Sequence, residues 1–261
     1  SYGLISYWTA YFKANYPEEY MACLLNAYSG NSDKLAGSVT ECKRLKIPVL
    51  PPNVNFSAEE FTVEHQEDGA TAVRFGLATI KNVGTTAVHP IVEAREKQGP
   101  FDSIEQMCRI ANMESLNRKA LESLIKAGAF DSFGPRGGLL ESMGRILSLA
   151  QSEANLKNSK QTSMFDMFGE SVPAPLAQIN IPEIEISSSE RSAWENELLS
   201  VDLTNNNHLY KLADNVDSGT IISQSQITPD MVGSKVVLIG QVSAASQRLT
   251  REQKPFAIAS L

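Results

Sequence analysis

The residues of this sequence most suited to chemistry are those that could hold a phosphate group. In the stretch FGLATIKNVGTTAV, Asn82 and Gly84 interrupt a helical pattern. Thr85 and Thr86 can cap the helix that restarts. Glycine adopts positive φ without steric cost, and asparagine is among the few other residues that do so. A tight hairpin between two short helices leaves backbone N–H groups unpaired, and Lys81 adds a positive charge beside them. The pattern predicts a phosphate site, with an αα-turn that binds nothing as the alternative.

A second turn of the same kind follows in LNRKALESLIKAGAF. A helix that contains Leu121, Leu124 and Ile125 meets Gly128, and Lys126 lies beside the turn. Arg118 and Lys119 of the same stretch are further candidates for contact with DNA. Residues 71–160, which contain both turns, carry 12 Lys and Arg against 9 Asp and Glu. Two such turns in a basic stretch favour binding to the phosphates of one duplex.

The overall charge argues against a uniformly basic nucleic-acid binder. The chain of 261 residues has a net charge of -7, and residues 161–230 alone hold 2 Lys and Arg against 11 Asp and Glu. A local basic face can still bind phosphates, because salt screens the field of exposed charges beyond about 10 Å.

Cysteine usage and hydropathy restrict the class of protein. Cys23, Cys42 and Cys108 are far apart and belong to no CxxC or Cys/His cluster. We therefore expect reduced thiols in a cytoplasmic protein without a metal site. The sequence shows no signal peptide and no apolar run long enough to span a bilayer, so we expect no membrane partner.

The elements that must position the candidate residues are mostly helical. Helical patterns cover residues 1–28, with a new start at Pro17, and residues 31–46, 77–97, 103–127, 136–155 and 189–200, the last with Ser189 as its expected cap. Alternating stretches at 61–64 and 71–75 flank a Glu67-Asp68-Gly69 turn and predict a β-hairpin. Strands are expected at 234–242 and 254–261, joined by a basic loop that contains Arg248, Arg251 and Lys254.

Several of these stretches resemble one family. RFGLATIKNVG, PFDSIEQMCR, NRKALESLIKAGAFDSFG, KANYPEEYMACLLN and PVLPPNVNFS resemble the bacterial replicative DNA polymerase III α subunit, a C-family polymerase. The resemblance is collinear from residue 1 to about 200, and the last strands are similar to the start of that family's OB domain. One departure is Asn82, where the family usually has glycine.

The resemblance implies an α+β, mostly helical fold. Its parts would be distal fingers helices (1–50), an extended segment with a β-hairpin (51–76), a tandem helix-hairpin-helix region for duplex and clamp binding (77–155), an acidic linker (156–188), a helix and connector (189–230) and a truncated OB-fold segment (231–261).

The same resemblance implies partners and a missing active site. Duplex DNA, other replisome subunits and, through the OB segment, single-stranded template would be partners. The family's three palm carboxylates, which hold two Mg ions for nucleotidyl transfer, have no counterpart in this chain. We therefore name no catalytic or metal-binding residue and no cofactor, and we expect the chain alone to be inactive.

An apolar island interrupts the acidic linker. In QTSMFDMFG, large apolar side chains stand in a polar stretch, where they must pack on this protein or on another. Gln161, Met164 and Phe165 fit the pentapeptide by which the family binds the β sliding clamp. A segment folded back on its own core is the alternative.

Two further readings stay open from the sequence. The chain could be a stand-alone helix-hairpin-helix DNA-binding or scaffold protein, or a segment of a lesion-bypass C-family polymerase. Both ends of the chain have the look of a cut within a longer protein, which favours a polymerase segment. The length of the encoding gene would separate the three readings.

Overall fold

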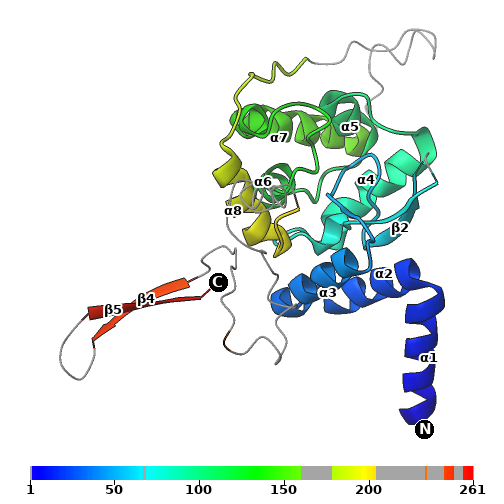
Figure 1. Cartoon of the computed structure of the whole chain (residues 1–261). Helices are drawn as coiled ribbons and strands as arrows, with labels where there is room; N and C mark the ends of the chain where they lie inside the picture. The colour runs from blue at the N-terminus through cyan, green and yellow to red at the C-terminus, as the bar shows by residue number, and fades with distance from the viewer. Residues whose placement is uncertain are drawn as a thin grey trace. The chain divides into compact units, whose positions relative to one another are not determined.

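The computed structural model describes residues 2–66, 69–159, 178–203, 233, 244–249 and 255–260. The chain divides into two compact units, Ser1–Thr204 and Asn205–Leu261 (Figure 1). The first unit is mostly helical with one small sheet, which confirms the α+β class expected from the sequence.

Three helices open the first unit: α1 (Tyr2–Asn15), α2 (Pro17–Tyr28) and α3 (Ser32–Arg44). Helix α2 begins where the sequence predicted, because Pro17 is pre-organised for the first helical position and cannot donate the amide bond that α1 would need to continue. The side chain of Asn31 caps α3 by accepting from the Lys34 amide at 3.0 Å.

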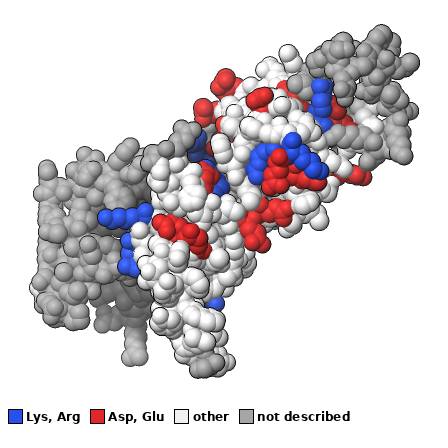
Figure 2. All heavy atoms as spheres, turned by 90° about the vertical axis from the view of Figure 1, so that its right-hand side faces the viewer, with Lys and Arg blue, Asp and Glu red and all other residues white. Residues whose placement is uncertain are grey.

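Helix α1 buries none of its residues. Its apolar side chains include Tyr7, Trp8, Tyr11 and Phe12, which line a shallow surface pocket. The lowest part of the surface in Figure 2, where α1 lies, is almost free of charged residues. The rest of that face mixes acidic and basic groups.

A three-stranded sheet follows, built from β1 (Val49–Leu50), β2 (Thr62–His65) and β3 (Thr71–Arg74) in the order β1-β3-β2. Strands β2 and β3 form the antiparallel hairpin that the alternation predicted, with Val63 opposite Val73. Strand β1 pairs with β3 in parallel, a long-range contact that no local pattern signals.

The remaining elements of the first unit surround the predicted hairpins. They are the 3-10 turn η1 (Leu77–Thr79) and helices α4 (Thr85–Gln98), α5 (Ile104–Ile110), α6 (Arg118–Lys126), α7 (Arg136–Ser159) and α8 (Ser188–Leu199). Their apolar faces share one buried cluster with α2, α3 and the sheet, in which Phe75 and Phe130 are fully buried.

Three local expectations were wrong. The pattern over 103–127 is two helices, because Asn117 caps a new helix by accepting from the Ala120 amide at 2.8 Å. The chain before the first hairpin is one 3-10 turn and not an α-helix. The cap of α8 is Ser187 and not Ser189, since Ser187 forms a reciprocal capping box with Glu190.

The second unit is described only in part. Strands β4 (Ala244–Leu249) and β5 (Pro255–Ser260) pair antiparallel, with Ala244 opposite Ser260. Strand β5 agrees with the expected strand at 254–261. The expected loop position of Arg248 is wrong, because its backbone pairs with that of Phe256 and so extends the ladder into the stretch taken as a loop. The strand expected at 234–242 lies outside the described residues.

Among the described residues, no helix is long and apolar enough to cross a membrane.

Candidate nucleic-acid interface

The first hairpin, residues 80–84, joins η1 to α4. Asn82 is the residue with positive φ, at 68°. Gly84 is extended, with φ -96° and ψ 156°, and forms the N-cap of α4. The sequence correctly predicted a helix start here, but the left-handed position belongs to Asn82 alone.

The backbone amides of this hairpin are only partly open. The Lys81 amide was expected to be unpaired, but it donates to the Leu198 carbonyl of α8 at 3.0 Å. The Val83 amide donates to the Ile80 carbonyl, also at 3.0 Å. In the described part of the chain, the amides of Gly84, Thr85 and Thr86 find no acceptor. These three groups open a 14-residue helix, where the helix dipole favours an anion.

The second hairpin, residues 127–135, joins α6 to α7 and is built differently. Gly128 has φ 88°. Its amide donates to the Ile125 carbonyl and the Ala129 amide donates to the Leu124 carbonyl, both at 3.0 Å, which is a Schellman cap. These amides are therefore used within the protein. A Cβ on Gly128 would overlap the guanidinium of Arg136, so packing inside the protein requires this glycine.

Two side-chain bonds join the first hairpin and the start of α4 to α6 and the chain just before it. The Asn82 amide nitrogen Nδ2 lies 3.3 Å from the Ser123 hydroxyl of α6. The Ser115 hydroxyl donates to the Thr86 carbonyl at 2.6 Å, which brings the chain just before α6 to the start of α4. The N-termini of α4 and α6 are thereby linked.

The predicted cations differ in what surrounds them. Lys81, Arg118 and Lys119 are exposed, and none forms an ion pair within the described ranges. Arg118 and Lys119 stand in the first turn of α6, where the helix dipole disfavours positive charge. Their placement therefore has no reason in the stability of α6.

Lys126 is engaged within the protein. Its Nζ lies 2.6 Å from a Glu122 carboxylate oxygen and 5.4 Å from the centre of the Trp194 ring. Its side chain is about a quarter exposed. A phosphate at this position would therefore share the ammonium with Glu122.

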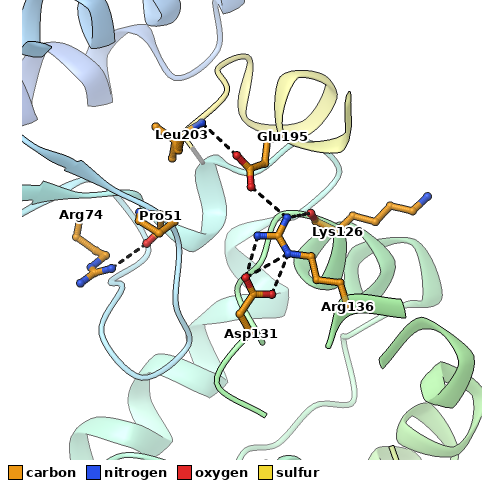
Figure 3. A network of polar contacts seen from close by, with 7 residues as sticks. All are labelled: Pro51, Arg74, Lys126, Asp131, Arg136, Glu195 and Leu203. Atoms are coloured by element: carbon orange, nitrogen blue, oxygen red, sulfur yellow. Dashed lines mark hydrogen bonds and ion pairs between the residues drawn. The ribbon is translucent and has the colours of Figure 1, made fainter. Parts of the chain in front are cut away.

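A buried arginine, which the sequence analysis missed, organises the second hairpin (Figure 3). Arg136 begins α7, and its side chain is 3% exposed. Its guanidinium donates to the Asp131 carboxylate at 2.8 Å, to the Lys126 carbonyl at 3.0 Å and to the Glu195 carboxylate of α8 at 3.1 Å. Figure 3 shows the Lys126 side chain pointing away from this network. The sequence signal was an arginine directly after Pro135, where a helix start is expected and a cation is unfavourable.

Charge balance keeps this arginine ionised. Burial lowers the pKa of Arg136, but the hydrogen bonds and charges of Asp131 and Glu195 outweigh burial, so the net shift of its pKa is upward. Glu195 is also buried, with a side chain 1% exposed, and its second oxygen accepts from the Leu203 amide at 3.1 Å.

An extended segment, residues 178–187, runs back along α7 to reach α8. The Ile179 amide donates to a Glu105 carboxylate oxygen at 2.7 Å, and the Ser142 hydroxyl donates to the Asn180 carbonyl at 3.3 Å. A Cβ on Gly137 or Gly138 would overlap the backbone of this segment. The two glycines in the first turn of α7 thus allow the segment to approach the helix.

The other predicted site residues cannot be placed. Gln161, Met164, Phe165, Arg251 and Lys254 lie outside the described residues, and only the backbone of Arg248 is described. Within the described ranges, no three His, Cys, Asp or Glu side chains are grouped so that they could hold a metal ion.

Comparison with known proteins identifies relatives of both the region and the chain. The model of a helix-hairpin-helix motif family matches residues 46–138, which include both hairpins. A DNA polymerase III subunit alpha from Deinococcus radiodurans is 40% identical over 201 residues, which cover 77% of this chain and 15% of that protein. The same subunit from Thermus aquaticus is 37% identical over 253 residues, or 96% of this chain and 20% of that protein. The Mycobacterium tuberculosis subunit is 33% identical over 100% of this chain and 22% of its own length.

Proposed function

We propose that this chain, which belongs to the DNA polymerase III α subunit family, grips duplex DNA and tethers a replicative polymerase to its sliding clamp. The chain spans about a fifth of the length of the curated relatives that it matches. The grip is assigned to the helix-hairpin-helix region and the tether to the pentapeptide QTSMF. The matches run over nearly the whole chain in several relatives, which favours a polymerase segment over a stand-alone scaffold protein.

One observation carries the proposed grip on DNA. Open amides at the start of α4 lie beside Lys81, and the Ser115–Thr86 bond links them to the start of α6 with its cations Arg118 and Lys119. Backbone amides and exposed cations together form a surface for phosphate oxygens, which carry no base identity. Binding is therefore expected to depend on salt and not on sequence.

A pair of matched variants tests the grip. Lys81→Glu places a negative charge beside the open amides, whereas Lys97→Glu makes the same change in the last turn of α4, about 20 Å along the helix. In a titration with a short duplex, Lys81→Glu should weaken binding. It should also make the slope of log affinity against log salt less negative by about 1. Lys97→Glu should leave that slope unchanged. Equal effects of the two variants would refute the assignment of the first hairpin.

The clamp tether rests on sequence alone. Ordering a peptide costs about 1–2 kcal/mol per residue in backbone entropy, and burying Met164 and Phe165 returns roughly 1.5–3 kcal/mol each. The ordering cost therefore offsets the gain from these two side chains, so the affinity should be modest, which suits a contact that must release.

The register of the clamp motif is tested by two double variants. Met164→Ala with Phe165→Ala should remove most of the affinity for a purified sliding clamp and leave the helical circular dichroism unchanged. Met167→Ala with Phe168→Ala is the matched control and should do less. If the control pair matters and the first pair does not, the register is wrong; if neither matters, the segment folds back on its own protein.

We further propose that this chain alone does not perform nucleotidyl transfer, because no residues in it match the family's palm carboxylates. A purified sample should add no nucleotide to a primed template with Mg²⁺. Incorporation that copurifies with the protein through two chromatographic steps would contradict this proposal.

A further inference from the structure

Helix α8 contacts both hairpins through its C-terminal half, although it begins more than fifty residues after the second of them. Its Leu198 carbonyl accepts the Lys81 amide of the first hairpin at 3.0 Å. Its Glu195 carboxylate accepts from Arg136, the residue that begins α7 directly after the second hairpin, at 3.1 Å. Its Trp194 ring lies 5.4 Å from the Lys126 ammonium, next to the second hairpin. One helix therefore fixes the two turns relative to each other.

The Arg136 guanidinium is the centre of this arrangement (Figure 3). It bonds the last helical carbonyl of α6 at Lys126, the hairpin residue Asp131 and the α8 residue Glu195, while its own backbone begins α7. Four parts of the fold are thus joined at one planar group. The fork of N–H donors on an arginine suits such a junction, because its geometry is rigid.

A buried ion pair of this kind is poorly suited to adding stability. Removing Arg136 and Glu195 from water costs about as much as their attraction returns, so such a pair is weak support for a stabilising role. What a buried, directional pair can supply is a single geometry. Here that geometry is the spacing between the two hairpins.

We propose that Glu195 is a positioning residue for duplex binding, which holds α6 and the second hairpin against the first hairpin so that the starts of α4 and α6 engage phosphates of one duplex. The inference rests on the proposed grip on DNA. Glu195 touches no DNA itself and acts through Arg136 and through the placement of α8 against the first hairpin. Loss of its charge should loosen α6 and the second hairpin from the first hairpin and leave a grip by the start of α4 alone.

The test compares three variants in the full chain. Glu195→Gln keeps the shape of the side chain and removes its charge. Glu197→Gln makes the same change on an exposed residue of the same helix. Ser187→Ala weakens α8 at its cap without touching the network, so it reports the effect of a less stable helix alone.

The readout is the salt dependence of affinity for a short duplex, because its slope counts the phosphates engaged. Glu195→Gln should lower the affinity for the duplex at least threefold at about 0.1 M salt. It should also make the slope of log affinity against log salt less negative by about 1 or more. Glu197→Gln and Ser187→Ala should keep the wild-type slope. Glu195→Asp, which keeps the charge on a shorter side chain, should recover part of the slope, and it replaces Glu195→Gln in the comparison if that variant does not fold.

A wild-type slope in Glu195→Gln, or in Glu195→Asp where it replaces that variant, would overturn the positioning role and leave the proposed grip intact. If the wild-type chain itself bound duplex without salt dependence, the proposed grip would fail, and the positioning role with it. The two failures are therefore distinguishable from the same titrations.

Discussion

Asn82 combines two properties that no other residue of the first hairpin has. It is held at φ 68°, and its side chain reaches the Ser123 hydroxyl at 3.3 Å. Asparagine accepts the left-handed region more readily than other residues with a Cβ. Asparagine at this position therefore keeps the turn and adds a link to α6.

The cost of changing Asn82 follows from these properties. Asn82→Ala should destabilise the chain by about 1–2 kcal/mol, because alanine pays the left-handed strain and loses the Ser123 contact. Asn82→Gly should be close to neutral, since it relieves strain while losing the contact. Urea denaturation followed at 222 nm measures both free energies of unfolding. Equal destabilisation by the two variants would show that strain plays no part.

The three thiols should differ in reactivity. All are free; Cys23 is exposed, whereas Cys42 and Cys108 are buried. Burial raises the pKa of Cys42 to about 11 and that of Cys108 to about 12. Because the thiolate is the nucleophile, one thiol per chain should react with a disulfide reagent at pH 8, and two more only after unfolding. A Cys23→Ser control should show no reactive thiol in the folded chain.

At the residue scale, the sequence predicted where the turns fall better than what each residue does. Gly128 was correctly placed at a helix end, because a glycine after an amphipathic helix is a strong local signal. The guanidinium of Arg136 occupies the space that a Cβ at position 128 would need. Arg136 lies eight residues later and pairs with Glu195, and no local sequence pattern predicts that contact.

At the scale of the element, helix α8 begins with a capping box at Ser187. Ser187→Ala should therefore cost about 1 kcal/mol, because it removes the acceptor of the Glu190 amide. Ser189→Ala, in the exposed residue that the sequence suggested as the cap, should cost less than about 0.5 kcal/mol. Thermal unfolding of the two single variants compares them directly. A larger loss for Ser189→Ala would mean that α8 starts later than the structure places it.

Element types were predictable and element ends were less so. The hairpin β2–β3 and the start of α2 followed from alternation and from Pro17. The break between α5 and α6 was missed, because both sides continue an apolar pattern and the cap at Asn117 is a single residue. The pairing of β1 with β3 was missed because two parallel strands are separated by a long stretch of sequence, and no local pattern predicts which strands will pair.

At the scale of the whole molecule, the first unit holds one continuous core and the chain divides after Thr204. A chain that ends at Thr204 should therefore fold without the second unit. Its melting temperature, followed by circular dichroism, should lie within about 2–4 °C of the same transition in the full chain, a shift that corresponds to 1 kcal/mol. Loss of the cooperative transition on truncation would show that the second unit is needed for the core.

The extent of the core could be predicted from the sequence only in outline. Apolar periodicity identified the helices that contribute to it, but it could not show that α8 returns to the hairpins after the acidic stretch. That return depends on the close passage of residues 178–187 over Gly137 and Gly138, which is a matter of fit between distant segments.

The late position of α8 also sets an order of events during synthesis. The acceptor of the Lys81 amide, the Leu198 carbonyl, is made more than a hundred residues after its donor. At about 5–20 residues per second, the first hairpin is synthesised roughly 6–23 s before its partner exists. For that interval the nascent chain carries two hairpins that are linked through α6 but not yet through α8, and the spacing proposed for duplex binding is complete only when translation has passed Leu203.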